Sequence, residues 1–177
     1  MTNKRLLLLT FIFLLLLNKN ASAGPLEYSA GSGKILECKT KNKTAHEIMV
    51  DGIKSNYSDK ELEMLQKIAI AEAKCDGIDG MSYVVRVILN RVMSERFPDS
   101  IEKVITQNGQ FSTVRNGSYA RSIPDEDSFE ACFKAILFLD DNDALFFEND
   151  NGKESTWHSR NLEYLFEYKH HKFYNHN

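Results

Sequence analysis

The sequence predicts an α+β fold, with helices in the first half of the domain and a small antiparallel sheet in its C-terminal half. From Ser58 onward, apolar residues recur at helical spacing in several successive segments. From Ala144 onward they fall in short, aromatic-rich runs separated by turn residues, which is typical of strands. The 177 residues amount to one domain with short extensions.

The first helix is predicted to begin at Ser58, because Ser58 and Glu61 have the spacing of a capping box. An apolar stripe follows at helical spacing and includes Ile68. Glu72 falls on the same stripe, four residues after Ile68. Gly77 is expected to end this helix.

Three further helices are expected. They cover residues 79–96, residues 100–107, and a segment capped by Asp125 or Asp127. Residues 107–124 are rich in Gly, Ser and Asn and are predicted to form a long surface loop, a kind of segment that often carries function. Short strands are expected at residues 144–147, 162–168 and 172–174.

Residues 1–23 have the features of a signal peptide. Lys4 and Arg5 precede an apolar run at residues 6–17, and Ala21-Ser22-Ala23 resembles a cleavage site. A run of this length is shorter than the roughly 20 residues that a membrane-spanning helix needs. We therefore expect export to the periplasm, cell wall or medium with no membrane span after cleavage; an uncleaved anchor is the alternative.

Residues 24–57 are polar and Lys-rich and are predicted to be a linker or disordered arm, so residues 58–177 would form the ordered domain. Loss of the leader, which holds three basic and no acidic residues, takes the net charge from −3 to −6. An acidic protein is a poor match for nucleic acid, because binding needs a basic face. We expect a monomer.

The cysteines Cys38, Cys75 and Cys132 cannot all pair within one chain. One disulfide with one free thiol, or three thiols, both fit the sequence. The histidines do not follow a metal-ligand spacing: His158, His170, His171 and His176. No metal or other cofactor is therefore expected.

Glu72 is the strongest candidate for chemistry. A carboxylate on an apolar helix stripe loses solvation, which raises its pKa and suits it to act as a general acid. The alternative is a structural ion pair with Arg86 or Arg91, and the pattern alone favours this pair.

The predicted loop offers candidate sugar contacts. Gln110 and Ser112 could form hydrogen bonds to sugar hydroxyls or amides, and Phe111 could pack against a sugar face or fill the core. Aromatic residues near the C-terminus could line a carbohydrate groove or form the core of the sheet: Trp157, Tyr164, Phe166, Tyr168, Phe173 and Tyr174.

Several motifs together resemble a known family. The segment at residues 68–80 reads IAIAEAKCDGIDG and is followed at residues 87–92 by VILNRV. The resemblance continues through GQFS at residues 109–112 and ALFF at 144–147, and ends with HHKFY at 170–174. In order and spacing these motifs resemble the spore cortex-lytic cell wall hydrolases of the SleB/CwlJ type over roughly residues 65–174.

The resemblance implies a lysozyme-like α+β fold and action on peptidoglycan. It also implies that Glu72 is the catalytic residue, which reverses the preference for an ion pair. Gln110, Phe111, Ser112 and Phe147 are the implied substrate contacts.

One well-placed acid fits a lytic transglycosylase. Glu72 would protonate the oxygen between N-acetylmuramic acid and N-acetylglucosamine, then act as base on the C6 hydroxyl of the muramic residue. The alternatives are a hydrolytic muramidase with Asp76 or Asp125 as second carboxylate, an N-acetylmuramoyl-L-alanine amidase, and a non-catalytic wall-binding protein. In each case the expected partner is the peptidoglycan glycan strand.

Overall fold

The computed structural model describes residues 45–137, 142–150, 152 and 155–177. The chain divides into two units, one ending at Asn56 and the other running from Tyr57 to Asn177. In the first unit, helix α2 (Ala45–Asn56) occupies the last part of the segment predicted to be an arm. The predicted leader at residues 1–23 and the rest of the arm lie outside the described residues.

Helix α3 (Asp59–Ala73) begins where the sequence predicts. The Ser58 hydroxyl accepts a hydrogen bond from the Glu61 backbone N–H at 3.2 Å, and the Glu61 carboxylate accepts one from the Ser58 N–H at 2.9 Å. The capping box is therefore confirmed, and it fixes the start of the helix that carries Glu72.

The helix ends earlier than the sequence predicts. A 3-10 turn, η1 (Lys74–Asp76), follows α3 directly, and α4 (Gly77–Met93) begins at the residue expected to end the first helix. Gly77 has a φ of +75°, which a residue with a side chain adopts only with strain, so it forms the corner between the two helices.

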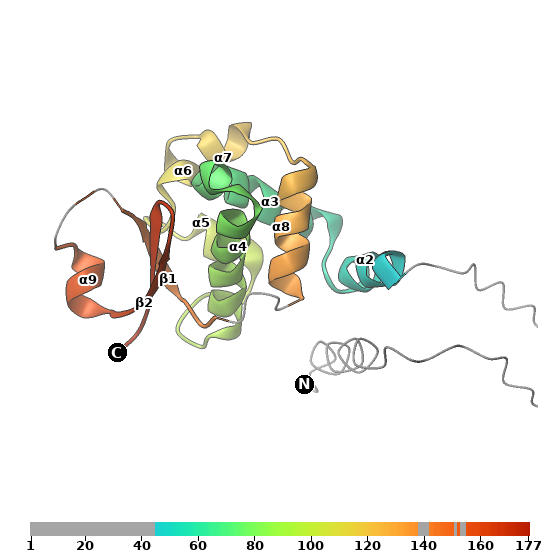
Figure 1. Ribbon diagram of the computed structural model, residues 1–177. Coiled ribbons are helices and arrows are strands. Elements are labelled where there is room, and N and C mark those ends of the chain that lie inside the picture. The colour runs from blue at the N-terminus through green and yellow to red at the C-terminus, as the bar shows by residue number, and fades with distance from the viewer. Residues whose placement is uncertain (1–44, 138–141, 151, 153–154) are drawn as a thin grey trace, which may run out of the picture. The chain divides into compact units, whose positions relative to one another are not determined.

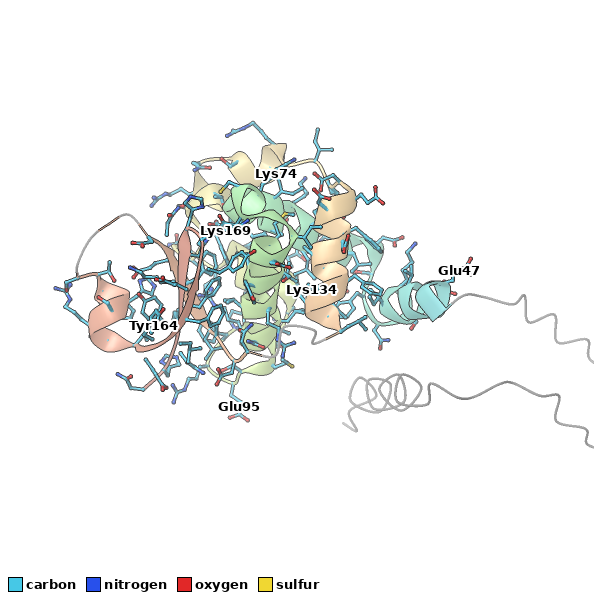
Figure 2. The ribbon with its side chains drawn as sticks, in the orientation of Figure 1. Glu47, Lys74, Glu95, Lys134, Tyr164 and Lys169 are labelled. Atoms are coloured by element: carbon cyan, nitrogen blue, oxygen red, sulfur yellow. The ribbon has the colours of Figure 1, made fainter. Side chains whose placement is uncertain are left out.

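The helical core forms where α4 packs against α3 and α8 (Glu126–Ile136), as Figure 1 shows. Asp125 caps α8 and is one of the two residues predicted as its possible cap. Helix α4 is apolar on more than one face because it also faces the sheet; its buried apolar residues are Met81, Val84, Val85, Val87, Ile88 and Leu89. At its surface, Lys134 Nζ of α8 pairs with the carboxylate of Asp79 on α4 at 2.6 Å. Figure 2 labels Lys134 at α8.

Helix α5 (Ile101–Thr106) confirms the predicted third helix and is capped by Ser100. The next segment differs from the predicted long loop, because it contains two single-turn helices, α6 (Ser112–Arg115) and α7 (Ser118–Arg121). Its polar composition hides turns this short, since they bury no apolar stripe of their own.

The sheet has three antiparallel strands: β1 (Phe146–Asn149), β2 (Glu163–Tyr168) and β3 (His171–Asn175). Strand β3 lies between the other two. A short helix, α9 (Trp157–Asn161), connects β1 to β2 and was not predicted. In Figure 1 the sheet lies between α4 and α9.

A second apolar cluster joins α4 to the sheet. Val87 of α4, Ala144 and Phe173 of β3 are fully buried together. The Tyr83 ring of α4 and the Phe166 ring pack edge to face with centroids 5.2 Å apart. This cluster fixes the sheet against the helices and so sets the position of β1 relative to α4.

The predicted α+β class is confirmed: the described part of the chain is mostly helical, with a small antiparallel sheet in its C-terminal part. Among the described residues, no helix is both long and apolar enough to cross a bilayer.

Candidate active site

A cleft of about 580 Å³ opens between the end of α3, the segment after α5, strand β1 and helix α9. Its size lies in the range of small-ligand pockets, about 300–1,000 Å³. The described residues that line it are Ala71, Glu72, Arg91, Gly109, Gln110, Ser112, Thr113, Phe146, Phe147, Glu148, Asn149, Trp157, His158 and His171. We refer to it as the Glu72 cleft.

Glu72 lies in the last turn of α3 and is half-buried. Burial removes water from its carboxyl group and raises its pKa. The hydroxyl of Thr113 in α6 donates a hydrogen bond to Glu72 Oε1, and together with the charge of His171 it offsets part of this rise. The pKa stays above its ordinary value, so the protonated acid persists closer to neutral pH.

The two arginines proposed as ion-pair partners of Glu72 form hydrogen bonds to the segment that precedes β1. Arg91 Nε donates a hydrogen bond to the carbonyl of Leu145 at 2.7 Å, and Arg86 Nε donates one to the carbonyl of Asn142 at 3.5 Å. The Arg91 guanidinium is buried, with its carbon 5.0 Å from the Phe97 ring centroid, and burial lowers its pKa to about 10. Arg91 therefore anchors the start of β1 as a cation.

Asp76 lies outside the cleft lining and is fully buried. Burial alone would raise its pKa, but hydrogen bonds from His170 Nδ1 at 2.5 Å and His171 Nδ1 at 2.7 Å lower it. A side chain at Gly80 would place its Cβ only 2.2 Å from the Cβ of Asp76, so the glycine leaves room for the carboxylate. Asp76 thereby fixes the His171 ring, which lines the cleft beside Glu72.

One group among the described residues has the donor set of a metal site. Atoms of Cys75, Asp76 and His170 lie within 4.8 Å of one another. The sequence did not indicate it because His170 is 94 residues from Asp76. The bonds from the two imidazoles to Asp76 account for this arrangement without an ion. Cys75 is an exposed thiol and Cys132 a buried one, while Cys38 lies outside the described residues.

Three of the four predicted sugar contacts line the cleft. Gln110 and Ser112 are exposed there, and Phe147 is half-buried in β1. The expectation for Phe111 requires a correction, because its ring is only 4% exposed and lies outside the cleft lining. It packs 5.5 Å from the Arg91 guanidinium and 6.1 Å from the Phe147 ring, so it supports the cleft from the core.

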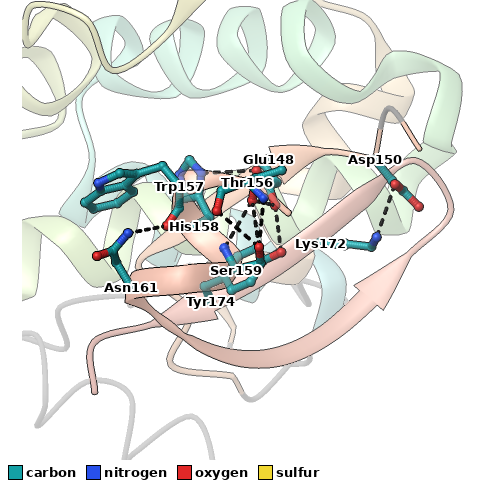
Figure 3. A network of polar contacts seen from close by, with 9 residues as sticks. All are labelled: Glu148, Asp150, Thr156, Trp157, His158, Ser159, Asn161, Lys172 and Tyr174. Carbon is teal, nitrogen blue, oxygen red and sulfur yellow. Dashed lines mark hydrogen bonds and ion pairs between the residues drawn. The ribbon is translucent and has the colours of Figure 1, made fainter. Parts of the chain in front are cut away.

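A second carboxylate lines the cleft. Glu148 of β1 has a side chain that is 14% exposed. Its Oε1 accepts hydrogen bonds from the Tyr174 hydroxyl at 2.7 Å and the Thr156 hydroxyl at 2.8 Å, and its Oε2 lies 3.2 Å from His158 Nδ1 (Figure 3). These donors come from β3 and from the start of α9, so Glu148 connects α9 to the sheet.

The sequence did not predict three of these lining residues, Thr113, Glu148 and His158. Thr113 is 41 residues from Glu72, and Tyr174 is 26 residues from Glu148, so neither pair forms a local pattern. A local signal was present only at α9, where Thr156 and Ser159 form a capping box.

The sequence profile of the Cell Wall Hydrolase family matches residues 75–174, which is more than half of the chain. The chain belongs to this family. The match begins three residues after Glu72 and includes every described lining residue of the cleft except Ala71 and Glu72. The resemblance to the cell wall hydrolases drawn from the sequence motifs is thereby confirmed.

Full-length relatives of this cell wall hydrolase include two spore cortex-lytic enzymes. The enzyme of Bacillus subtilis is 30% identical over 102 residues, which are 57% of this chain and 33% of the relative. That of Oceanobacillus iheyensis is 29% identical over 106 residues, which are 59% of this chain and 38% of the relative. The chain thus spans about a third of the length of the curated relatives it matches.

Two solved structures have the same fold. The catalytic domain of the germination-specific lytic transglycosylase SleB from Bacillus anthracis aligns with a TM-score of 0.60 and 28% identity, covering 67% of this chain and 97% of that domain. The catalytic domain of the Bacillus cereus SleB protein aligns with a TM-score of 0.60 and 25% identity, covering 67% of this chain and 92% of that domain.

Proposed function

We propose that this cell wall hydrolase is an exported lytic transglycosylase. It cleaves peptidoglycan glycan strands between N-acetylmuramic acid and N-acetylglucosamine, and Glu72 is its catalytic residue. The observation that carries the proposal is a half-buried carboxyl group with a raised pKa in the lining of a ligand-sized cleft. The likeness to the catalytic domain of a lytic transglycosylase supports the same reaction.

In this mechanism Glu72 starts protonated. It gives its proton to the bridging oxygen as the bond to C1 of the muramic residue breaks. The resulting carboxylate then removes the proton of the C6 hydroxyl, which closes on C1 to form a 1,6-anhydro ring. Glu72 is protonated again at the end of the cycle. Thr113 supports the first step, because its hydrogen bond favours the ionised carboxylate that remains once the proton has left.

Around Glu72, Gln110 and Ser112 are proposed to bind polar groups of the sugar, and Phe147 to contact its apolar face. Phe111 contributes from below by supporting Phe147 and Arg91. The Nδ1 atom of His171 is bound to Asp76, which holds the ring in place. The charge of His171 favours the ionised form of Glu72.

The alternative chemistry is hydrolysis with a second carboxylate. Neither predicted partner is free for it: Asp76 is fully buried outside the cleft lining, and Asp125 caps α8 and pairs with Lys74 at 3.1 Å. Glu148 does line the cleft, which keeps hydrolysis as the second candidate. Its oxygens, however, are already engaged by Thr156, Tyr174 and His158.

The test combines a variant with product analysis. Glu72→Gln keeps the shape of the side chain and removes its proton, so the folded variant is expected to lose more than about 100-fold of its wall-lytic activity. Mass spectrometry of fragments released by the wild type is expected to find 1,6-anhydro-muramic ends, lighter by one water than reducing ends. Reducing ends throughout would establish hydrolysis, and free stem peptides with intact glycan would establish an amidase.

A further inference from the structure

Trp157 is the only tryptophan of the chain, and its position is unusual for so large an apolar side chain. It is 57% exposed, and it lines the Glu72 cleft. An exposed indole loses favourable burial, which a ligand covering the ring would restore. We therefore expect a ligand to cover the exposed indole of Trp157.

The backbone that carries Trp157 is held firmly. Thr156 caps α9 and donates its hydroxyl to Glu148, while His158 lies against the other oxygen of the same carboxylate (Figure 3). On the far side of the indole-bearing residue, Asn161 Nδ2 donates a hydrogen bond to the Trp157 carbonyl at 2.7 Å. Both neighbours of Trp157 are bound to the side chain of Glu148 on β1. The backbone that carries the Trp157 ring is therefore held in place.

The ring is also oriented. The Trp157 and His158 rings meet edge to face, with centroids 5.5 Å apart and planes at 89°. Edge-to-face packing is the arrangement that the quadrupoles of the two rings favour, and it limits rotation of the indole. A flat apolar face with one N–H donor at its edge suits a pyranose ring, whose axial C–H groups cover the face while a hydroxyl or amide accepts from the N–H.

We infer that Trp157 forms a sugar-binding subsite of the cleft, which stacks on an N-acetylated pyranose of the glycan strand, and that Glu148 positions it. The inference rests on the proposed function for the identity of the strand. Glu72 comes from α3 and Trp157 from α9, so a strand that contacts both residues crosses the cleft. Trp157 binds and does not take part in the proton transfers.

The single tryptophan makes a direct measurement possible, because the indole fluorescence of the protein comes from Trp157 alone. The Glu72→Gln variant is titrated with soluble peptidoglycan glycan oligomers that lack stem peptides, and binding is followed by calorimetry and by fluorescence. Stacking is expected to shift the emission to shorter wavelength and to reduce acrylamide quenching by about twofold, because a sugar covers one of two ring faces.

The outcomes separate the two proposals. Heat of binding with unchanged emission and quenching would overturn the Trp157 subsite and leave the proposed function standing. Loss of both signals would overturn the subsite and count against glycan strands as the substrate. Emission changes without loss of wall lysis in Glu72→Gln would support the subsite and contradict the assigned acid.

Variants of the otherwise wild-type enzyme give a second measurement. Trp157→Ala is expected to raise KM for soluble glycan about tenfold with little change in kcat, because stacking acts equally on substrate and transition state. Trp157→Phe keeps a flat ring and should recover part of the loss. The control is Ile123→Ala, since Ile123 is an exposed apolar residue (80%) outside the cleft lining. An equal effect of Ile123→Ala, or an unchanged KM in Trp157→Ala, would overturn the subsite.

Discussion

At the scale of single residues, the ionisation of Glu72 results from opposing effects. Desolvation raises its pKa, whereas Thr113 and His171 stabilise the charged form and lower it. An acid/base residue needs both, because it must hold a proton at the start of the reaction and release it within the same cycle. The balance is adjustable through Thr113, whose hydroxyl contacts the carboxylate directly.

Thr113→Val removes that hydrogen bond and keeps the shape of the side chain. The pKa of Glu72 is then expected to rise further, because the ionised form loses a donor. The alkaline limb of the pH profile of kcat/KM should move to higher pH, since the proposed mechanism starts from protonated Glu72. Thr113→Ser retains the hydroxyl and is expected to keep the profile of the wild type. A shift to lower pH in the valine variant would contradict the assigned role of this bond.

Asp76 is expected to matter for stability before it matters for chemistry. Asp76→Asn leaves two imidazoles facing a neutral amide in a fully buried position, and is expected to lower the free energy of unfolding by roughly 2–4 kcal/mol. The measurement is denaturant unfolding at neutral pH. Asp99→Asn is the control, because the Asp99–Lys103 pair is exposed and should contribute little.

The same variant has a pH signature. The folded-state pKa of Asp76 is lowered, so its contribution to stability is present above the ordinary aspartate range and is lost as pH falls through the lowered value. The difference between wild type and Asp76→Asn should therefore shrink on acidification. A difference that grows as pH falls would show that the carboxylate does not stabilise the folded chain.

At the scale of elements, the parts of the fold with strong local patterns were predicted correctly. Helix α3 follows from its capping box and apolar stripe, and α5 and α8 from their caps and inward apolar residues. Apart from α2, a 12-residue helix in the segment predicted to be an arm, the elements that differ are short. Helices α6, α7 and α9 have four or five residues each, too few to show a periodicity, and tertiary contacts rather than local propensity hold them in place.

The residues of the candidate site likewise include some that the sequence predicted and some that it did not. The sequence motifs placed Glu72, Gln110 and Ser112 among the candidate residues, and the structure brings all three to the cleft. The Glu148 network could not, because it joins β1, α9 and β3, and only the folded sheet brings Tyr174 opposite Phe146 and next to Glu148. The error over Phe111 has the same origin, since the sequence cannot tell a ring that faces the cleft from one that packs below it.

Helix α9 is expected to depend on Glu148. Glu148→Ala removes the partner of Thr156 and His158 and should free α9 from the sheet, which would lower the fluorescence anisotropy of Trp157 and increase its quenching by acrylamide without any ligand. Glu148→Gln keeps an acceptor for Thr156 and Tyr174 and should recover part of the wild-type anisotropy. Unchanged anisotropy in Glu148→Ala would show that α9 is held by other contacts.

At the scale of the whole molecule, every described residue that lines the Glu72 cleft lies in the unit from Tyr57 to Asn177. The two SleB catalytic domains match about two thirds of this chain and nearly all of their own length. The curated spore cortex-lytic enzymes are longer and match over about a third of theirs. The shared part therefore corresponds to the SleB catalytic domains, and the curated enzymes extend beyond it.

The part of the chain before Tyr57 is accordingly expected to be dispensable for cleavage. A shortened chain of residues 57–177 keeps the capping box at Ser58, both apolar clusters and the whole cleft lining, so it should fold cooperatively and retain kcat/KM on soluble glycan within about threefold of residues 24–177. The comparison needs thermal unfolding of both chains, so that a loss of activity can be separated from a loss of fold. On intact wall sacculi the two chains should differ only if the preceding segment binds the wall. A shortened chain that folds but fails to cleave soluble glycan would show that residues before Tyr57 complete the active site, and would contradict the assignment of the reaction to the Glu72 cleft alone.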